Sequence, residues 1–460
     1  MRRYMWAVAV LAVAATGLVM GAGGAAGAGP AAHKVSVSPL IQGRASAGPD
    51  ATFGCQTRPM DGSQGPRCYQ ATQVQNAYNV TPLLNRGIDG TGRTIVVIDA
   101  YGSPSMASDL QDFDAAMGLP APNFSQIAPA GAPPAFDPND GNQIGWGVET
   151  SLDVEWAHAI APGANIVLAV APSNNDSDLL NVLQYVVAHH VGDVITQSYG
   201  EAEDCMDPAL LAEQHQAFAA AAQEGITVFA SSGDSGASQP ACDPNSTAAQ
   251  LAVSTPASDP LVTGVGGTTL TANTSTGAYI GETAWTEPFG CNPPAIASDD
   301  VNCSGGGFSS LFSRPAFQAS TYKGAHALTR GVPDVAYNAG ASGGVLVHIG
   351  FYLELLGYPA DAPIFFIVGG TSAGSPQWAG LAADGDQLAG RALGDINPAL
   401  YAISNAKRQY SAGLHDITTG NNDVSEIGDG YNAGTGWDPV TGLGTPNAAN
   451  LLPLLVGHTS

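Results

Sequence analysis

Short apolar segments that alternate with amphipathic ones are the feature of this sequence that most limits its fold. The apolar segments are 94–100, 165–171, 193–200 and 226–236, the last running into a loop, and the amphipathic ones are 75–87, 105–118, 147–163, 177–190 and 208–225. Strands alternating with helices predict an α/β fold with a doubly wound, mostly parallel sheet and helices on both faces. Functional side chains gather at the carboxyl ends of strands in such sheets. Three polar sequences follow apolar segments in this way: SYG at 198–200, SGDSG at 232–236 and GGTS at 369–372.

The N-terminus has the pattern of an export signal. Arg2 and Arg3 precede an apolar run, and small residues at 26–28 offer a cleavage site. A membrane anchor is the alternative, but the run is short for a span. We expect residues 1–28 to be a signal peptide, 29–69 a short pro-segment or N-terminal extension, and 70–460 the functional domain of a secreted, extracellular protein.

The charge balance excludes some partners. The chain has 39 acidic residues against 14 lysines and arginines, a formal net charge of −25. Nucleic acids and anionic membranes are therefore poor partners. A surface with few basic groups gains less positive charge as its carboxylates are protonated, so the composition is compatible either with simple solubility or with life in acid.

Six cysteines in an exported chain suggest three disulfides. Pairing of neighbours along the chain would give Cys55–Cys68, Cys205–Cys242 and Cys291–Cys303, although sequence alone leaves other connectivities open. No Cys-x-x-Cys or His-x-x-x-His spacing occurs, which argues against a metal cluster.

Two carboxyl groups, Glu149 and Asp153, are four residues apart in a helical stretch, so they lie on one helix face. Like charges this close favour sharing one proton, which separates their two pKa values. Such a pair can act as a general base in acid, where histidine is already protonated. The alternative is an exposed acidic helix face, and Glu155 could be the partly buried acid instead.

Two further residues follow apolar strands. Asp234 lies between Gly233 and Ser235, in a tight turn that can present a side chain. It is either an Asx-turn residue or, if protonated, a hydrogen-bond donor to a developing oxyanion. Ser372 lies where a buried strand breaks into a helix, and it is either a helix N-cap or a nucleophile.

Together, these motifs resemble the sedolisin family of serine-carboxyl peptidases, including kumamolisin-like enzymes. The resemblance covers roughly residues 70–455. It rests on Glu-x-x-x-Asp at 149–153, Asp234 in SSGDSG, and Gly-Thr-Ser-x-x-x-Pro at 370–376. Secondary matches are ASDPLVTGVGGTTL, SGGGFSSLFSRPAFQ, RGVPDVAYNA and GWDPVTGLGTPN.

The resemblance implies a subtilisin-like peptidase domain at 70–460 and a role for each motif. It implies that Ser372 attacks the peptide carbonyl, that Glu149 is the base and that Asp153 shares its proton. It implies that protonated Asp234 stabilises the tetrahedral intermediate together with the Ser372 amide. Asp99 and Tyr199 occupy the positions at which kumamolisin-like enzymes extend the carboxylate network with Glu and Trp.

The resemblance also implies one structural Ca²⁺ in a C-terminal calcium-binding loop region. Its ligands would be the carboxylates of Asp416 and Asp438 and the carbonyls of Ile417, Gly434 and Gly436. Carboxylate and carbonyl oxygens are the ligands that Ca²⁺ prefers. A polar loop without a metal is the alternative. Many relatives carry a pro-domain of well over a hundred residues, much longer than the segment expected here.

The expected function is that of a secreted, acid-acting endopeptidase that hydrolyses protein or peptide substrates through an acyl-enzyme and works as a monomer. One alternative is a catalytically inactive binding protein on a peptidase fold. Another is a subtilisin using Asp99, but the His-Gly-Thr-His motif is missing and the nearest histidine, His158, lies within a helix. Cleavage preference, and endopeptidase against tripeptidyl-exopeptidase action, stay open at this point.

Overall fold

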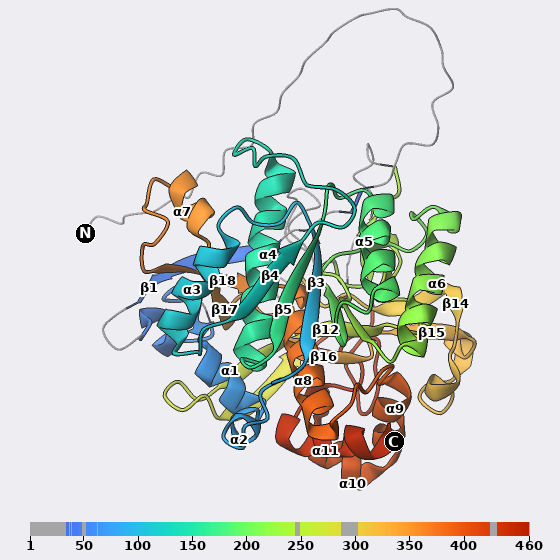
Figure 1. Ribbon diagram of the computed structural model, residues 1–460. Coiled ribbons are helices and arrows are strands. Elements are labelled where there is room, and N and C mark those ends of the chain that lie inside the picture. Colours follow the sequence, from blue (N-terminus) through green and yellow to red (C-terminus); the bar gives the residue numbers. More distant parts are fainter. Residues whose placement is uncertain are drawn as a thin grey trace, which may run out of the picture. The chain divides into compact units, whose positions relative to one another are not determined.

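The computed structural model describes residues 34–459 except for 36, 38, 48–51, 62, 244–248, 287–301 and 424–429. An eight-stranded sheet forms its centre, in the order β13-β12-β8-β6-β3-β5-β4, with β16 also paired to β12 (Figure 1). Seven strands are parallel, and β13 is antiparallel to β12. The strands are β3 (Thr94–Ala100), β4 (Asn123–Ile127), β5 (Asn165–Ala171), β6 (Val194–Gln197), β8 (Thr227–Ser231), β12 (Thr263–Ala272), β13 (Tyr279–Ala284) and β16 (Val335–Asn338).

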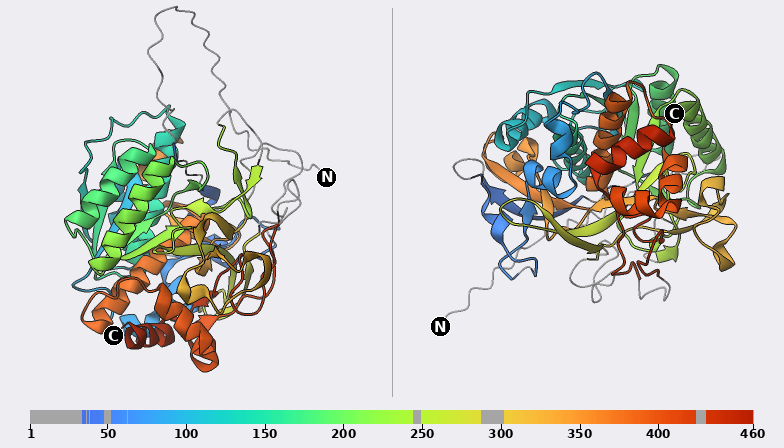
Figure 2. Two further views of the ribbon diagram at one scale, coloured as in Figure 1. Left: turned by 90° about the vertical axis from the view of Figure 1, so that its right-hand side faces the viewer. Right: turned by 90° about the horizontal axis from the view of Figure 1, so that it is seen from below.

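Helices cover both faces of this sheet, as the alternation of segments predicts. The helices of the described chain are α1 (Ala71–Ala77), α2 (Thr81–Leu84), α3 (Met106–Met117), α4 (Gly141–Ile160), α5 (Asp176–Ala188), α6 (Pro208–Gln223), α7 (Gly350–Leu355), α8 (Gly374–Ala389), α9 (Asn397–Asn405), α10 (Lys407–Gly413) and α11 (Ala448–His458). Figures 1 and 2 show α5 and α6 together on one face and α4 and α8 on the other. The subtilisin-like α/β architecture expected from the sequence is therefore present.

Strand β3 shows why two helical layers are needed. Side chains of successive strand residues point to opposite faces. Ile95 and Val97 join the hydrophobic cluster that contains α4 and α8, whereas Val96 and Ile98 join the cluster that contains α5 and α6. A strand that is apolar on both faces must be covered on both.

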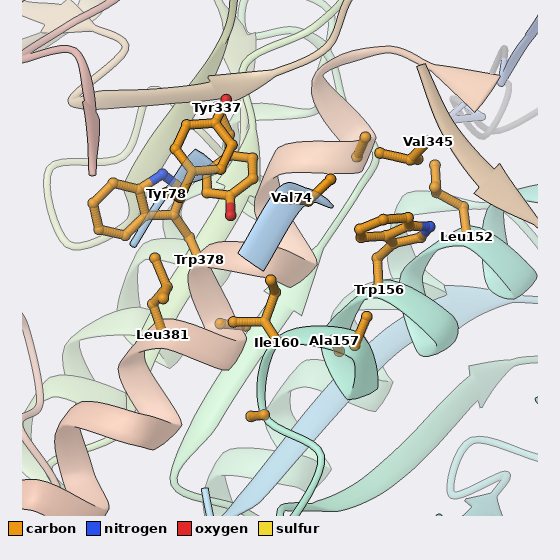
Figure 3. Packing of buried hydrophobic residues seen from close by; sticks show 14 of the residues in the cluster. Val74, Tyr78, Leu152, Trp156, Ala157, Ile160, Tyr337, Val345, Trp378 and Leu381 are labelled. Atoms are coloured by element: carbon orange, nitrogen blue, oxygen red, sulfur yellow. The ribbon is translucent and has the colours of Figure 1, made fainter. Parts of the chain in front are cut away.

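The α4–α8 contact is the part of the core that holds the candidate site. Figure 3 shows Ile160 at the end of α4 and Leu381 on α8 in the same cluster, with Trp378 beside the rings of Tyr78 and Tyr337. Gly380 lies on the α4-facing side of α8, where a Cβ would come within 2.8 Å of the Ile160 Cβ. The two helices therefore approach closely, which fixes their relative position.

A second sheet, in the order β1-β18-β17-β2, contains the strand that leads to Ser372. Its strands are β1 (Leu40–Ser46), β2 (Cys68–Tyr69), β17 (Gly344–Val347) and β18 (Ile364–Gly369). Strand β18 is antiparallel to both β1 and β17. The expectation that this strand belongs to the parallel sheet is therefore wrong, because an apolar run has the same pattern in either kind of sheet.

The segment before residue 70 packs into the same compact unit, His33–Ser460, as the rest of the described chain. Val35 N donates to Asn174 O at 2.9 Å, and Asn174 Nδ2 donates to Val35 O at 2.6 Å. Strand β1 then pairs with β18. Removal of this segment as a pro-segment stays a prediction, and the expected signal peptide lies outside the described residues.

Two of the three expected disulfides are present. Cys55 pairs with Cys68, and Cys205 pairs with Cys242. Cys303 is also disulfide-bonded, but Cys291, its expected partner, lies outside the described residues.

The remaining strands form two-stranded pairs, and one expected helix is divided. The pairs are β7 (Glu201–Ala202) with β11 (Ser254–Thr255), β9 (Ser238–Pro240) with β10 (Ala249–Leu251), β14 (Gly307–Ser313) with β15 (Thr329–Val332), and β19 (Leu414–His415) with β20 (Thr445–Pro446). The helix expected at 75–87 is α1 and α2, which are separated at Asn79, whose φ of 58° a helix does not allow. Across the described part of the chain, no helix combines the length and apolarity that crossing a bilayer requires.

Candidate active site

Helix α4 places Glu149 and Asp153 on one face, as their spacing predicts, and buries both completely. The helix begins at Asp140, whose side chain accepts a hydrogen bond from Asn142 N at 2.9 Å. The alternative of an exposed acidic helix face is therefore wrong. Glu155 is equally buried, but its Oε2 accepts a hydrogen bond from His348 N at 3.0 Å, outside this pair.

Ser372 lies in a short turn of 3-10 helix, Thr371–Ala373, between β18 and α8. It is 9% exposed, so it is nearly buried but reaches the surface. Gly370 precedes the turn with φ 112°, a conformation that favours glycine. The chain can therefore turn sharply from strand to helix and hold the hydroxyl at the joint.

The Ser372 hydroxyl faces the carboxyl end of β6 and the Glu149–Asp153 pair on α4. Its Oγ donates to Ser198 O at 3.4 Å. The hydroxyl is also near enough to Glu149 to lower the pKa of that carboxyl as a donor. Among the described residues neither oxygen of Glu149 has a hydrogen bond of standard length. Catalytic hydrogen bonds are often long before substrate binds, so this geometry suits a serine that gives its proton to Glu149.

Burial controls the protonation of the acids here. It raises the pKa of Glu149 well above its ordinary value, and the charges of Asp99 and Asp234 raise it further. Burial also raises the pKa of Asp153, with added repulsion from Asp99 and Glu149. Burial raises the pKa of Asp99 to about 7. Three buried carboxyl groups this close keep some of their protons, because ionising all of them without cations costs too much free energy.

Asp234 follows β8 in the expected tight turn and contacts the Ser372 turn directly. Its Oδ1 accepts hydrogen bonds from Thr371 N at 2.8 Å and from Thr371 Oγ1 at 2.6 Å. Burial raises the pKa of Asp234, while the two Thr371 bonds lower it. The structure thus brings Asp234, Ser372 and the Glu149–Asp153 pair together from three separate parts of the chain.

Asp99 and Tyr199 are the residues expected to extend the carboxylate network. Asp99 lies close to Glu149 and Asp153, whereas the hydroxyl of Tyr199 is hydrogen-bonded to another residue. Asp99, at the end of β3, is buried and acts electrostatically on both Glu149 and Asp153. The Tyr199 hydroxyl donates to Gln197 Oε1 at 2.7 Å, and its ring lies 5.7 Å from that of Trp146.

Three hydroxyl residues at the site are not among those expected from the sequence. Thr150 and Ser198 lie near enough to Asp99 and Asp153, respectively, for their hydroxyls to lower the pKa values of these carboxyl groups against the larger effect of burial. Thr371 donates to Asp234. Each is adjacent to an expected residue or motif, but hydroxyl residues next to acids are too common for sequence alone to single these out.

The expected calcium ligands also lie together, in the loops around β19 and β20. Gly436 N donates to Asp416 Oδ1 and Gly434 N to Asp438 Oδ2, both at 3.0 Å. Among the described residues, none donates a hydrogen bond to the backbone carbonyls of Ile417, Gly434 or Gly436. Two carboxylates and three uncommitted carbonyls fit a hard, oxygen-preferring cation. The described residues contain no cluster of three or more His, Cys, Asp or Glu that would suit another kind of metal site.

Two known peptidases are similar to this chain over most of its length. The chain is 34% identical over 455 residues to kumamolisin from Bacillus sp. (strain MN-32), which covers 92% of this chain and 72% of kumamolisin. It is 30% identical over 388 residues to sedolisin from Pseudomonas sp. (strain 101), which covers 84% of this chain and 59% of sedolisin. No protein-family model matches the chain.

A solved structure shows the same fold. The structure of Pseudomonas sedolisin, described as a serine-carboxyl proteinase complexed with two molecules of pseudo-iodotyrostatin, superimposes with a TM-score of 0.70 at 28% identity. It covers 86% of this chain and all of the sedolisin chain. These similarities place the chain in the class of serine-carboxyl peptidases. The chain belongs to the sedolisin family of that class.

Proposed function

We propose that this protein is a secreted endopeptidase that acts in acid, with Ser372 as nucleophile and Glu149 as general base. The observation that carries the proposal is the complete burial of Glu149 and Asp153 beside a nearly buried Ser372. A histidine would be the ordinary base for such a serine. Carboxyl groups with raised pKa values replace it in a medium where imidazole would stay protonated.

The acylation step follows from these positions. Ser372 Oγ attacks the carbonyl carbon of the scissile bond, and its proton passes to Glu149. The carbonyl oxygen becomes an oxyanion, which accepts hydrogen bonds from protonated Asp234 and from the Ser372 amide. The carbon–nitrogen bond then breaks as Glu149 returns the proton to the leaving amine, and the acyl group remains on Ser372.

Deacylation repeats these roles with water. A water molecule gives its proton to Glu149 as its oxygen attacks the ester carbonyl, and Asp234 again donates to the oxyanion. The bond to Ser372 Oγ breaks, and Ser372 recovers the proton from Glu149. Asp153 shares a proton with Glu149 throughout, and Asp99 keeps that proton in the network by raising the pKa values of both acids.

The pH dependence of this chemistry has a definite sign. At low pH Glu149 is protonated and cannot accept the proton of Ser372. As pH rises, Asp234 loses its proton and a carboxylate then faces the oxyanion. Activity therefore rises as the Glu149–Asp153 pair loses the first of its two protons, and falls as Asp234, whose pKa burial raises, loses its proton.

The first test is a pH–rate profile on a denatured protein substrate. We expect cleavage with a maximum near about pH 3–5 and loss of activity toward neutral pH. The cleavage sites, mapped on the same substrate, separate endopeptidase from tripeptidyl-exopeptidase action. An optimum at neutral pH that disappears in His158→Ala would contradict the carboxyl base, and no cleavage at any pH would favour the inactive binding protein.

We propose that the C-terminal loops hold one structural Ca²⁺ through Asp416, Asp438 and the carbonyls of Ile417, Gly434 and Gly436. A bound Ca²⁺ would join the segment just after β19, which carries Asp416 and Ile417, to the segment before β20, which carries Gly434, Gly436 and Asp438. The ion neutralises two carboxylates that otherwise repel each other, and it binds oxygen ligands that only the folded chain brings together.

Removal of calcium is expected to destabilise the protein. At a free Ca²⁺ concentration 100 times the dissociation constant, binding stabilises the fold by about 2.7 kcal/mol, so chelation lowers the melting temperature. Differential scanning fluorimetry with and without chelator measures this shift. Asp438→Asn is the control, since its melting temperature should be lower from the start and insensitive to chelator. A wild-type melting curve unchanged by chelator would contradict the site.

Export and substrates complete the proposal. Residues 1–28 would direct secretion and be removed, and two intrachain disulfides suit an oxidising compartment. Family membership makes peptides or proteins the substrates. We expect the enzyme to act as a monomer. The inactive binding protein stays the alternative, although Ser372, Glu149, Asp153 and Asp234 are all present.

A further inference from the structure

The carboxyl group of Asp234 is held asymmetrically. Both hydrogen bonds from Thr371, from its backbone N at 2.8 Å and its Oγ1 at 2.6 Å, go to Oδ1. Oδ2 takes part in neither bond. The two oxygens of this carboxyl are therefore in different surroundings, although either could carry the acid proton in solution.

A third hydrogen bond fixes the direction of the Thr371 hydroxyl. Gly233 N donates to Thr371 Oγ1 at 3.2 Å, so this oxygen is an acceptor toward the β8 loop. A hydroxyl has one proton, and with Gly233 as donor that proton points to Asp234 Oδ1. Oδ1 is therefore an acceptor twice over, and the proton of neutral Asp234 has to be on Oδ2.

Gly370 makes the space that Oδ2 occupies. A Cβ on Gly370 would lie 2.6 Å from Oδ2 and 3.8 Å from Oδ1. Oδ2 therefore lies over the backbone of Gly370, two residues before Ser372, and Oδ1 is turned away from it. A donor at this place lies beside the backbone that leads through Thr371 to Ser372.

We propose that Thr371 is a positioning residue that holds Asp234 by Oδ1, so that Oδ2 carries the proton and donates a hydrogen bond to the oxyanion. The inference rests on the proposed function, in which protonated Asp234 faces the intermediate. Thr371 itself touches neither the substrate nor the reacting atoms, and it is almost completely buried.

The two hydrogen bonds from Thr371 and the burial of Asp234 have opposite effects on the pKa of this carboxyl group. Donors to a carboxyl oxygen favour the ionised form, so the bonds from Thr371 lower the pKa of Asp234 against the raising effect of burial. The titratable group that faces Asp234 is Glu149 on α4. From the β8 loop and the Ser372 turn, the described neighbours present amide and hydroxyl groups, which carry no charge. Loss of the Thr371 hydroxyl should therefore raise the pH at which Asp234 loses its proton.

The test uses Thr371→Val, which keeps the shape and the backbone bond but removes the hydroxyl, with Thr371→Ser as the matched control. In Thr371→Val we expect kcat to fall by about 10–100-fold, because Asp234 is no longer held, and the alkaline limb of the kcat profile to move up by about 0.5–1 pH unit. Thr371→Ser should restore both values toward wild type. Thr371→Ala tests the same loss if Val does not fold, and melting curves identify that case.

The outcomes separate this inference from the proposed function. A lower kcat with the alkaline limb unmoved, or moved to lower pH, would show a merely structural role and overturn the inference. So would a Thr371→Ser enzyme as impaired as Thr371→Val, since the methyl group would then matter and not the hydroxyl. Wild-type behaviour of all three variants also overturns the inference, but leaves the proposed function standing as long as the wild type cleaves in acid.

Discussion

Ser372→Ala is expected to lower kcat by a factor of about 10⁵–10⁶ without changing the fold, because the proton acceptor then has no nucleophile to serve. Structurally the substitution is mild. The hydroxyl makes one long hydrogen bond, of 3.4 Å to Ser198 O, and Ser372 reaches the surface. A small residual rate should remain, since substrate binding and the oxyanion donors persist.

The measurement compares turnover of a peptide substrate at the wild-type optimum with the melting temperature of each protein. Ser411→Ala, at an exposed position of α10, is the matched control and should retain wild-type activity. Turnover above about one per cent of wild type in Ser372→Ala would assign the nucleophile elsewhere. A melting temperature equal to that of wild type shows that the loss of activity is chemical.

The layout of the parallel sheet could be predicted because its strands are apolar on both faces. The strands β3 and β5 have the expected bounds, 94–100 and 165–171, and the expected helices α4, α5 and α6 are present. Burial on both sides leaves little choice of residue, so the pattern along the chain is unambiguous.

The position of β18 could not be predicted in the same way. Its residues are as apolar as those of β3, but its partners, β1 and β17, are a strand from the N-terminal segment and a strand on the far side of α7. Pairing of β18 with β1, which lies near the other end of the chain, depends on tertiary contacts that leave no local pattern.

At the site, the sequence predicted which acids lie together but not how they are held. The spacing of Glu149 and Asp153 gave their common helix face, and the family motif suggested Ser372 and Asp234. The sequence did not show that Glu155, two residues after Asp153, accepts a hydrogen bond from His348 N instead of joining the pair. Nor did it single out Thr371, because the contact of Thr371 with Asp234 joins residues 137 positions apart in the chain.

The central claim is that a carboxylate, Glu149, takes the proton that an imidazole takes in other serine peptidases. Glu149→Gln keeps the size of the side chain but removes the base, so kcat should fall by about 10³–10⁴-fold. The acid limb of the pH–rate profile should also disappear, because no carboxyl at this position is left to lose a proton. Glu155→Gln is the control, since glutamine can still accept the hydrogen bond from His348 N.

The pH–rate profiles of wild type, Glu149→Gln and Glu155→Gln, recorded side by side from about pH 2 to 8, test this claim most directly. We predict that Glu155→Gln keeps the wild-type acid limb, whereas Glu149→Gln loses the limb together with nearly all activity. A Glu149→Gln enzyme that turns over at close to the wild-type rate, with its acid limb in place, would contradict the account.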